Sequence, residues 1–152
     1  MKKIITSGFV ILLLFACATV PKGITPEDRA AIDAVVDKWV KALQAEDIEA
    51  FIDTYWPEFV HTSKKADGSV AETIRGIEEL RIQQQEWFDK GDYYGRIVYS
   101  GPQRDFESQP GKAIYTISGK LDQDKWGWQD IFQLTKRNGK WRIIDHVLIG
   151  LP

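Results

Sequence analysis

The stretch DIFQLTKRNGKWRIIDHV, residues 130–147, contains the clearest folding signal in the chain. Asn138-Gly139 lies between two segments in which apolar and polar residues alternate, which is the strongest short-range signal for a β-hairpin. This turn pairs Arg137 with Lys140, so it sets the register of both strands. Continued without interruption, the register places each inward residue of one strand opposite an inward residue of the other.

The same argument extends the sheet toward the N-terminus. A two-residue turn at Gln123-Asp124 places Ile117 opposite Asp130 and Gly119 opposite Trp128, where the absent side chain leaves room for an indole. The two turns together put one apolar set on a single face: Tyr115, Ile117, Trp126, Trp128, Phe132, Leu134, Trp141, Ile143 and Val147. We therefore expect four long antiparallel strands after Tyr93.

Three helices are expected ahead of these strands. Thr25-Pro26-Glu27-Asp28 has the cap, proline and acidic first turn of a helix start, and apolar residues then recur at helical spacing to about Ala45. Asp47 caps a shorter second helix, and a third covers residues 76–90, with a strand or small hairpin between the two. Helices that cover one face of an antiparallel sheet predict an α+β fold.

Composition bounds the function of the chain. Its 152 residues fit one domain, and a net charge of −2 argues against a nucleic-acid partner, which needs a basic face. With one cysteine and two histidines, neither an intramolecular disulfide nor a His/Cys zinc site is expected. Recognisable nucleotide, metalloprotease and serine-hydrolase motifs are missing, so we expect no cofactor and no metal.

The N-terminus predicts export. Residues 2–3 are basic, and residues 4–16 form an apolar run too short for a relaxed membrane span. Leu14-Phe15-Ala16-Cys17 resembles a bacterial lipobox, whose cysteine is lipidated; Ala16-Cys17-Ala18 also fits a cleavage site that would release a soluble periplasmic protein. We expect a signal peptide at 1–16, a tether at 17–24 and one domain at 25–152. Because Ala18 follows the cysteine, the lipobox resemblance implies an outer-membrane lipoprotein facing the periplasm.

Residues 31–60 (AIDAVVDKWVKALQAEDIEAFIDTYWPEFV) and 139–147 (GKWRIIDHV) resemble the nuclear-transport-factor-two-like superfamily, in its polyketide-cyclase-like and ketosteroid-isomerase-like branch. The resemblance covers nearly all of residues 25–152. It implies a conical barrel of a curved, mostly antiparallel sheet wrapped around three N-terminal helices, with a pocket between them. Members include isomerases, dehydratases, cyclases, binding domains and dimerisation modules, so the fold does not select an activity. Many relatives carry histidines at the positions of Asp145 and Val147, and this chain does not.

Two carboxylates are expected on the apolar face. The hairpin register makes Asp130 and Asp145 diagonal neighbours, with Cβ atoms roughly 7 Å apart. Mutual repulsion and burial should raise at least one of their pKa values, which is what acid–base catalysis requires. By resemblance to members that use a pocket Asp and Tyr, Tyr115 is the third candidate catalytic residue. The structural alternative pairs Asp130 with Arg104, and Asp145 with a buried Trp N–H or a helix terminus.

A second group of residues is expected to contact a ligand. His61 follows the second helix on a strand where relatives point a polar residue at the pocket. Aromatic side chains on the same face would form the walls, and their polar atoms need partners. The candidate ligand-binding residues are His61, Trp39, Tyr55, Trp126, Trp128, Phe132 and Trp141. His146 alternates with Asp145, so it is expected to face the other side.

The opposite sheet face is expected to carry Ile114, Ile131, Ile144 and Leu148, which is too apolar for a solvent face. By the resemblance, relatives bury this side in a homodimer, and we expect a homodimer here.

Three functions remain open. The chain binds a small, largely apolar molecule, it is an acid–base enzyme of isomerase, dehydratase or cyclase type, or it is a dimerisation module with a filled core. A cavity of roughly a few hundred Å³ that reaches the carboxylates would favour the first two.

Overall fold

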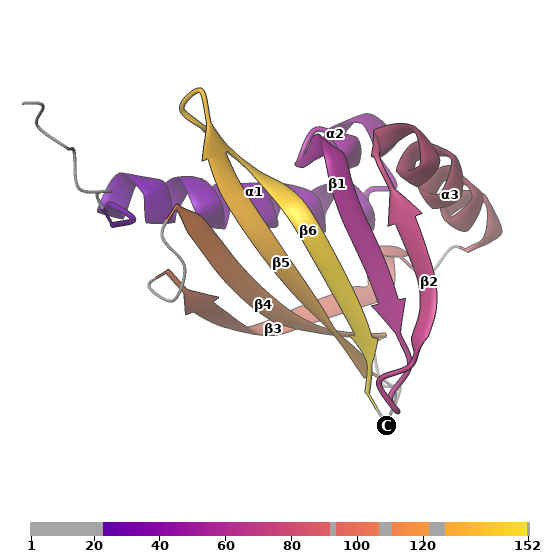
Figure 1. Cartoon of the computed structure of the whole chain (residues 1–152). Coiled ribbons are helices and arrows are strands. Elements are labelled where there is room, and N and C mark those ends of the chain that lie inside the picture. The colour runs from indigo at the N-terminus through magenta and orange to yellow at the C-terminus, as the bar shows by residue number, and fades with distance from the viewer. Residues whose placement is uncertain (1–22, 92–93, 107–110, 122–126, 152) are drawn as a thin grey trace, which may run out of the picture.

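The computed structural model describes residues 23–91, 94–106, 111–121 and 127–151 of the chain. The predictions for residues 1–22, including Cys17, for the Gln123-Asp124 turn and for Trp126 concern residues outside this part of the chain. The elements follow one another in the order α1 (Pro26–Gln44), α2 (Ile48–Ile52), β1 (Tyr55–Lys64), β2 (Val70–Arg75), α3 (Ile77–Lys90), a short 3-10 turn η1 (Tyr94–Arg96), β3 (Ile97–Asp105), β4 (Lys112–Leu121), β5 (Gly127–Arg137) and β6 (Lys140–Gly150) (Figure 1). The α+β fold is the one that the sequence predicts.

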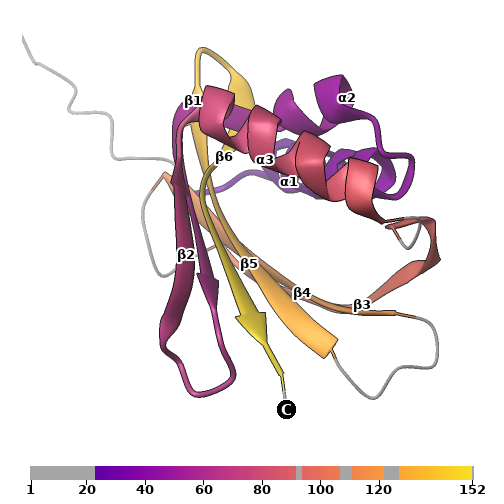
Figure 2. The same cartoon turned by 90° about the vertical axis from the view of Figure 1, so that its right-hand side faces the viewer.

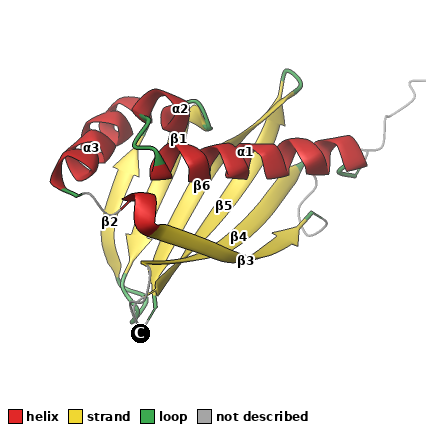
Figure 3. Cartoon of the chain, turned by 180° about the vertical axis from the view of Figure 1, so that it is seen from behind, coloured by secondary structure: helices red, strands yellow, loops and turns green. Residues whose placement is uncertain are grey.

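The strands form one six-stranded sheet in the order β2-β1-β6-β5-β4-β3. Neighbouring strands are antiparallel except β1 and β6, which run parallel. The sheet curves strongly, and the helices lie on its concave face, with α1 crossing the strands (Figures 2 and 3). The expected curved, mostly antiparallel sheet is confirmed. Because β2 and β3 end it as edge strands, the sheet is open, and the structure does not confirm the expected conical barrel.

The helix starts follow the predicted capping chemistry. Thr25 and Asp28 form a reciprocal capping box at α1, in which each side chain accepts a hydrogen bond from the other residue's backbone N–H. Asp47 caps α2 by accepting the N–H of Ala50 at 3.0 Å. The third helix begins after Gly76, whose φ of 81° needs a glycine. Within the described residues, no helix combines the length and apolar character needed to cross a bilayer.

The hairpin register holds only close to its turn. Arg137 pairs with Lys140, and Leu134 pairs with Ile143, as the Asn138-Gly139 turn predicts. The register then shifts by one residue, because Gln133 pairs with Asp145 and leaves Ile144 without a partner. This is a β-bulge, and it reverses the face of every later residue of β6 relative to the prediction.

The bulge corrects four of our face assignments. His146 lies opposite Phe132 and is buried, whereas Asp145 is on the convex face. Leu148 pairs with Asp130 and faces inward, so Val147 faces outward. The predicted juxtaposition of Asp130 and Asp145 is therefore wrong.

The predicted register between β4 and β5 is confirmed. Ile117 pairs with Asp130 and Gly119 pairs with Trp128. A Cβ atom on Gly119 would lie 2.6 Å from the indole carbon Cε2 of Trp128, so the indole occupies the space that glycine leaves. This close approach fixes the position of Trp128 on the concave face.

Candidate functional site

A cavity of about 440 Å³ lies between the concave face of the sheet and the helices. Elements from both ends of the chain contribute to it, including α1, α3, η1 and five of the strands. Most of its lining is apolar or aromatic. The lining residues are Trp39, Leu43, His61, Ser63, Glu72, Leu80, Gln84, Trp87, Tyr94, Ile97, Tyr99, Gly127, Trp128, Asp130, His146, Leu148 and Gly150. This size is ordinary for a small-molecule site.

A chain of hydrogen bonds runs through the floor of this cavity. Trp39 Nε1 donates to the hydroxyl of Tyr55 at 2.7 Å, and that hydroxyl lies 3.1 Å from His146 Nδ1. The other ring nitrogen, His146 Nε2, lies 2.8 Å from Asp130 Oδ1. Trp128 Nε1 donates to Asp130 Oδ2 at 2.9 Å. Two obligate indole donors therefore hold the ends of a chain that joins a phenol, an imidazole and a carboxyl group.

His61 joins the same chain from β1. It pairs with His146 across the parallel β1–β6 ladder, and the two Nδ1 atoms lie 3.2 Å apart. Each histidine is 4% exposed. The structure thus brings the chain's two histidines and the fully buried carboxyl group of Asp130 into one cluster.

Burial controls the charge of these groups. It raises the pKa of Asp130 to about 7, against the smaller opposing effect of the Trp128 N–H bond. It lowers the pKa of His146 to about 3, and that of His61 to about 3 with help from neighbouring His146. Burial also raises the pKa of the Tyr55 hydroxyl well above its usual value. At neutral pH the rings are therefore neutral and the phenol keeps its proton.

Two buried side chains at the cavity, Gln84 and His61, each have a nitrogen atom without a protein partner among the described residues. The amide nitrogen of Gln84 is buried and makes no hydrogen bond, although Gln84 lines the cavity from α3. His61 uses only Nδ1, which leaves Nε2 without a partner. Buried polar groups are normally hydrogen-bonded, so each is a site where a ligand atom would find a partner.

The expected ligand-binding residues divide into two groups. Trp39, His61 and Trp128 line the cavity. Tyr55 and Phe132 are fully buried behind it: Tyr55 bonds to Trp39 and His146, and the Phe132 ring centroid is 4.6 Å from that of His146.

Trp141 belongs elsewhere in the molecule. Its Nε1 donates to Asp28 Oδ1 at 2.8 Å, beside the N-terminus of α1. Trp141 is therefore part of the contact between α1 and the β5–β6 hairpin, and the structure does not bring it to the cavity.

Two of the three candidate catalytic residues are also outside the cavity. Asp145 lies on the convex face, where burial raises its pKa. A hydrogen bond from the backbone of His146, and then the charges of Lys112 and Lys64, partly oppose the rise. Tyr115 lines a separate open depression of about 300 Å³ between α1 and the β3–β4 strands. There the Arg104 guanidinium lies 5.1 Å from its ring centroid. Only Asp130 is placed at the cavity.

The structural alternative for Asp130 is also wrong. Arg104 forms an ion pair with Asp33 at 2.7 Å, so it is not the partner of Asp130. The actual partners are the indole N–H of Trp128 and the imidazole of His146. Asp130 therefore lies in a cluster without a Lys or Arg counter-charge among the lining residues.

Sequence reasoning missed His146 because it assumed an unbroken ladder. The sequence did carry a signal: Ile143-Ile144 places two apolar residues next to each other in an otherwise alternating strand. Such a break in the alternation is typical of a bulge. Gln84, in contrast, lies at an inward helical position, and its burial follows from spacing alone.

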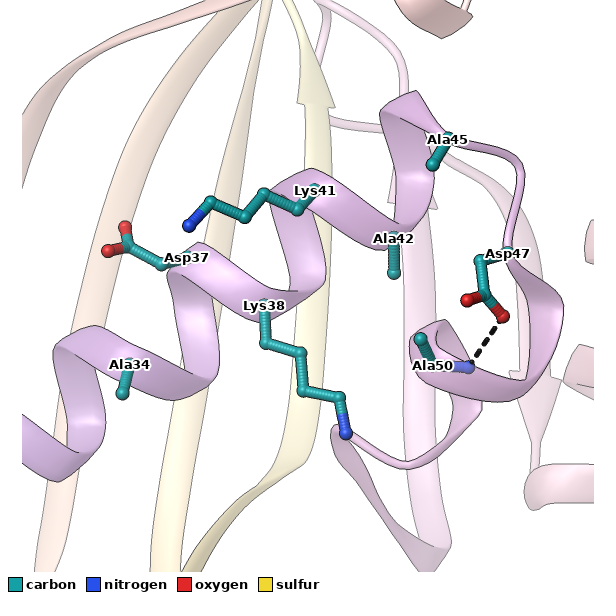
Figure 4. A pocket seen from close by; sticks show the side chains of 8 residues that line it. All are labelled: Ala34, Asp37, Lys38, Lys41, Ala42, Ala45, Asp47 and Ala50. Atoms are coloured by element: carbon teal, nitrogen blue, oxygen red, sulfur yellow. Dashed lines mark hydrogen bonds between the residues drawn. The ribbon is translucent and has the colours of Figure 1, made fainter.

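A second depression, of about 460 Å³, lies on the exposed side of α1 next to α2 (Figure 4). Alanines and charged side chains line it. The carboxylate of Asp47 is occupied by the Ala50 N–H, and Lys38 forms an ion pair with Asp53. Its polar groups are satisfied or solvated, so this groove is a less suitable ligand site than the cavity on the concave face.

Comparison with known proteins supports the fold. No family model and no curated protein matches the chain. Solved structures do match it at low sequence identity. A cystatin-like fold protein from Burkholderia xenovorans LB400 is 17% identical, with a TM-score of 0.66 over 86% of this chain and 96% of that one. An NTF2-like protein from Shewanella baltica OS155 is 15% identical, with a TM-score of 0.64 over 83% and 95%.

A ketosteroid isomerase-like protein from Erwinia carotovora atroseptica SCRI1043 is 17% identical, with a TM-score of 0.65 over 84% of this chain and 99% of that one. At these identities the likeness concerns the fold. The matches cover nearly the whole of each of these solved structures, so the similarity extends over an entire domain. The chain therefore has the fold of the nuclear-transport-factor-two-like superfamily, the superfamily that its sequence resembles.

Proposed function

We propose that the chain binds a small, largely apolar molecule in the cavity on the concave face. The observation that carries this proposal is the cavity itself: about 440 Å³, walled by aromatic and aliphatic side chains, with His61 and Gln84 presenting polar atoms that lack protein partners. Apolar walls with a few convergent polar groups are characteristic of small-molecule sites. A filled core, as in a ligand-free dimerisation module, would leave no such space.

The charge of the lining favours a neutral ligand over an anion. None of the described lining residues is a Lys or Arg, and burial keeps His61 and His146 uncharged. An anionic group would also approach Asp130 and would lose its hydration without gaining a counter-charge. We therefore expect a ligand with a broad apolar body and one or two neutral polar groups.

Filling the cavity tests the binding proposal. Leu148→Trp adds an indole from β6 into the cavity, and Ala34→Trp adds the same group to the exposed α1 groove as a matched control. Nile red, a neutral apolar dye, should bind the wild type and the control with similar affinity and bind Leu148→Trp at least tenfold more weakly. Native mass spectrometry should show the same pattern for a co-purified molecule. Equal dye binding by both folded variants would contradict the proposal.

A second candidate function is acid–base catalysis on the bound molecule. The observation that favours it is the buried cluster of Asp130 and His146, since a carboxyl group with a pKa of about 7 exchanges its proton near neutral pH. Asp130 with His61 would do this work, and the outlying Asp145 and Tyr115 would not. The cluster should catalyse deuterium uptake from D2O into a bound molecule. Asp130→Asn should abolish the uptake, and Asp145→Asn should leave it unchanged.

We also propose that a lipid on Cys17 holds the domain at the outer membrane, facing the periplasm. The proposal rests on the basic start, the apolar run and the lipobox-like residues of the N-terminus. Cys17→Ala should abolish incorporation of labelled palmitate and release the protein from the membrane fraction. Labelling of the variant, or a soluble periplasmic wild type, would contradict the proposal and favour simple cleavage.

A homodimer is proposed through the convex face of the sheet. Ile114 and Ile131 are partly exposed there, on neighbouring strands. Leu148, which was expected on this surface, lines the cavity on the other face of the sheet. The double variant Ile114→Glu/Ile131→Glu should sediment as a folded monomer at concentrations where the wild type is a dimer. A monomeric wild type would rule out this interface.

A further inference from the structure

The two histidines of the cluster constrain each other's protonation. Their Nδ1 atoms lie 3.2 Å apart, so one of them must carry a hydrogen and the other must accept it. Because burial keeps both rings neutral, each ring has one hydrogen in all. The ring that carries its hydrogen on Nδ1 has an unprotonated Nε2. The other ring has an unprotonated Nδ1 and carries its hydrogen on Nε2. The tautomers of His61 and His146 are therefore linked.

Asp130 selects between the two arrangements. When its carboxyl group is ionised, His146 Nε2 must donate to Oδ1 at 2.8 Å, so His146 Nδ1 is bare and accepts from His61 Nδ1. When Asp130 is protonated, its O–H donates to His146 Nε2, and His146 Nδ1 donates to His61. In the first arrangement His61 presents a bare Nε2 at the cavity, and in the second it presents an N–H.

We propose that His61, His146 and Asp130 form a proton relay in which His61 exchanges a proton with the molecule in the cavity and Asp130 stores it. The inference rests on the proposed binding of a ligand in this cavity. In this relay His61 is the group that contacts the ligand. Its strength as a base is set by the Asp130 carboxyl group, to which it is linked through two hydrogen bonds by way of His146.

The transfer balances in three coupled movements. A weakly acidic O–H or N–H of the ligand gives its proton to His61 Nε2. His61 gives the proton on Nδ1 to His146 Nδ1, and His146 gives the proton on Nε2 to Asp130 Oδ1. The ligand becomes one charge more negative, the carboxylate becomes a neutral acid, and neither imidazole is charged at the end. This avoids a buried imidazolium, which desolvation would penalise strongly.

The other titratable groups around the cluster do not replace Asp130. Tyr55 competes for His146 Nδ1, but burial raises its pKa and its oxygen accepts the Trp39 N–H in both arrangements. Tyr94 and Tyr99 line the same cavity from η1 and β3, and the pKa of Tyr99 is also raised by burial. Glu72 on β2 accepts a hydrogen bond from the Gln83 amide. Asp130 is thus the carboxyl group joined directly to an imidazole in this cluster.

Histidine tautomers can be measured directly in the ligand-free, full-length protein. The chain has two histidines, so selective ¹⁵N labelling gives the signals of two rings, and long-range ¹H–¹⁵N spectra report which nitrogen of each is protonated. Above pH 8, His61 should carry its proton on Nδ1 and His146 on Nε2. Near pH 5.5 both tautomers should be reversed, with one shared midpoint and no imidazolium. The Asp130 carboxyl ¹³C signal should shift with that same midpoint.

Two variants sharpen the test. Asp130→Asn should hold one tautomer pair across this pH range, whereas Asp145→Asn, on the same sheet but the convex face, should titrate like the wild type. Tautomers that do not change with pH in the wild type, or an imidazolium that forms on either ring near pH 6.5, would overturn the relay. Neither result needs a variant to fold. Because the measurement uses no ligand, its failure is distinct from a failure of Leu148→Trp to reduce dye binding.

Discussion

His146 Nε2 lies 2.8 Å from Asp130 Oδ1 at the floor of the cavity, and both side chains are almost completely shielded from water. Burial raises the pKa of the carboxyl group and lowers that of the imidazole, so a neutral pair is favoured over an ion pair. Such a pair makes stability depend on pH in a direction that can be worked out for each partner.

Relative to the wild type, Asp130→Asn should be more stable in alkaline solution than in acidic solution. The folded pKa of Asp130, about 7, is above its unfolded value of 3.8, so the wild type loses stability as pH rises from about 4 to about 7. The amide does not titrate and avoids that loss. Measured by urea unfolding, the difference between variant and wild type should move in the variant's favour by on the order of a few kcal/mol from pH 5 to pH 8. Asp37→Asn, at an exposed carboxylate of α1, serves as control. An equal difference between Asp130→Asn and wild type at both pH values would contradict the burial argument.

Asp28 should show the opposite pH dependence. Hydrogen bonds from Lys136 and Trp141, at 2.6 and 2.8 Å, lower its pKa to about 2. Its contribution to stability is therefore present above about pH 4 and is lost as pH falls through about 2. Asp28→Asn should cost about 1–2 kcal/mol at pH 7 and progressively less toward pH 2.

The control for Asp28 is Glu27→Gln, in the same first turn of α1 but exposed. It should change the free energy of unfolding by no more than about 0.5 kcal/mol. If both variants lose the same stability, the effect belongs to the helix dipole and not to the contacts with Lys136 and Trp141.

The parts of the fold that could be predicted are those fixed by local chemistry. Thr25, Asp47 and Asn138-Gly139 act through their immediate neighbours, so their helices and hairpin form as expected. The parallel pairing of β1 with β6 joins segments about 85 residues apart, and no local residue pattern marks it. The open edges at β2 and β3 likewise depend on how far the whole sheet curves.

The site was predictable up to the first irregularity of the ladder. Asp130, Trp128 and Gly119 lie on one side of the β4–β5 pair, where the register is unbroken, and they are where the sequence places them. His146 and Asp145 lie beyond the bulge at Ile144, and both faces were predicted the wrong way round. Because side chains alternate between the two faces of a strand, one extra residue is enough to move every later side chain to the opposite face.

Gly119→Ala should destabilise the protein through Trp128. The new Cβ would lie 2.6–2.7 Å from three indole atoms, including Nε1, so the indole must move and its hydrogen bond to Asp130 must weaken. We expect a loss of about 1–3 kcal/mol in thermal or chemical unfolding and weaker dye binding. Gly95→Ala is the control, because its Cβ would make only an ordinary contact at 3.6 Å with a Gln44 carbonyl. Equal effects would show that Trp128 is free to shift.

Single-residue deletions should separate the bulge from the regular strand. Ile144 has no partner in the ladder, so its deletion lets Ile143 and Asp145 follow one another in register and leaves both Ile143 and His146 facing inward. Deletion of Val147, which pairs with Ile131, moves Leu148 to the convex face and removes it from the cavity.

Removing Ile144 should cost about 1–3 kcal/mol, mainly from the lost side chain and local twist, with cooperative unfolding and dye binding retained. Removing Val147 should abolish dye binding and lower the melting temperature further. If the Ile144 deletion is the more damaging of the two by circular dichroism and thermal melts, the bulge has a structural role beyond setting which face His146 occupies.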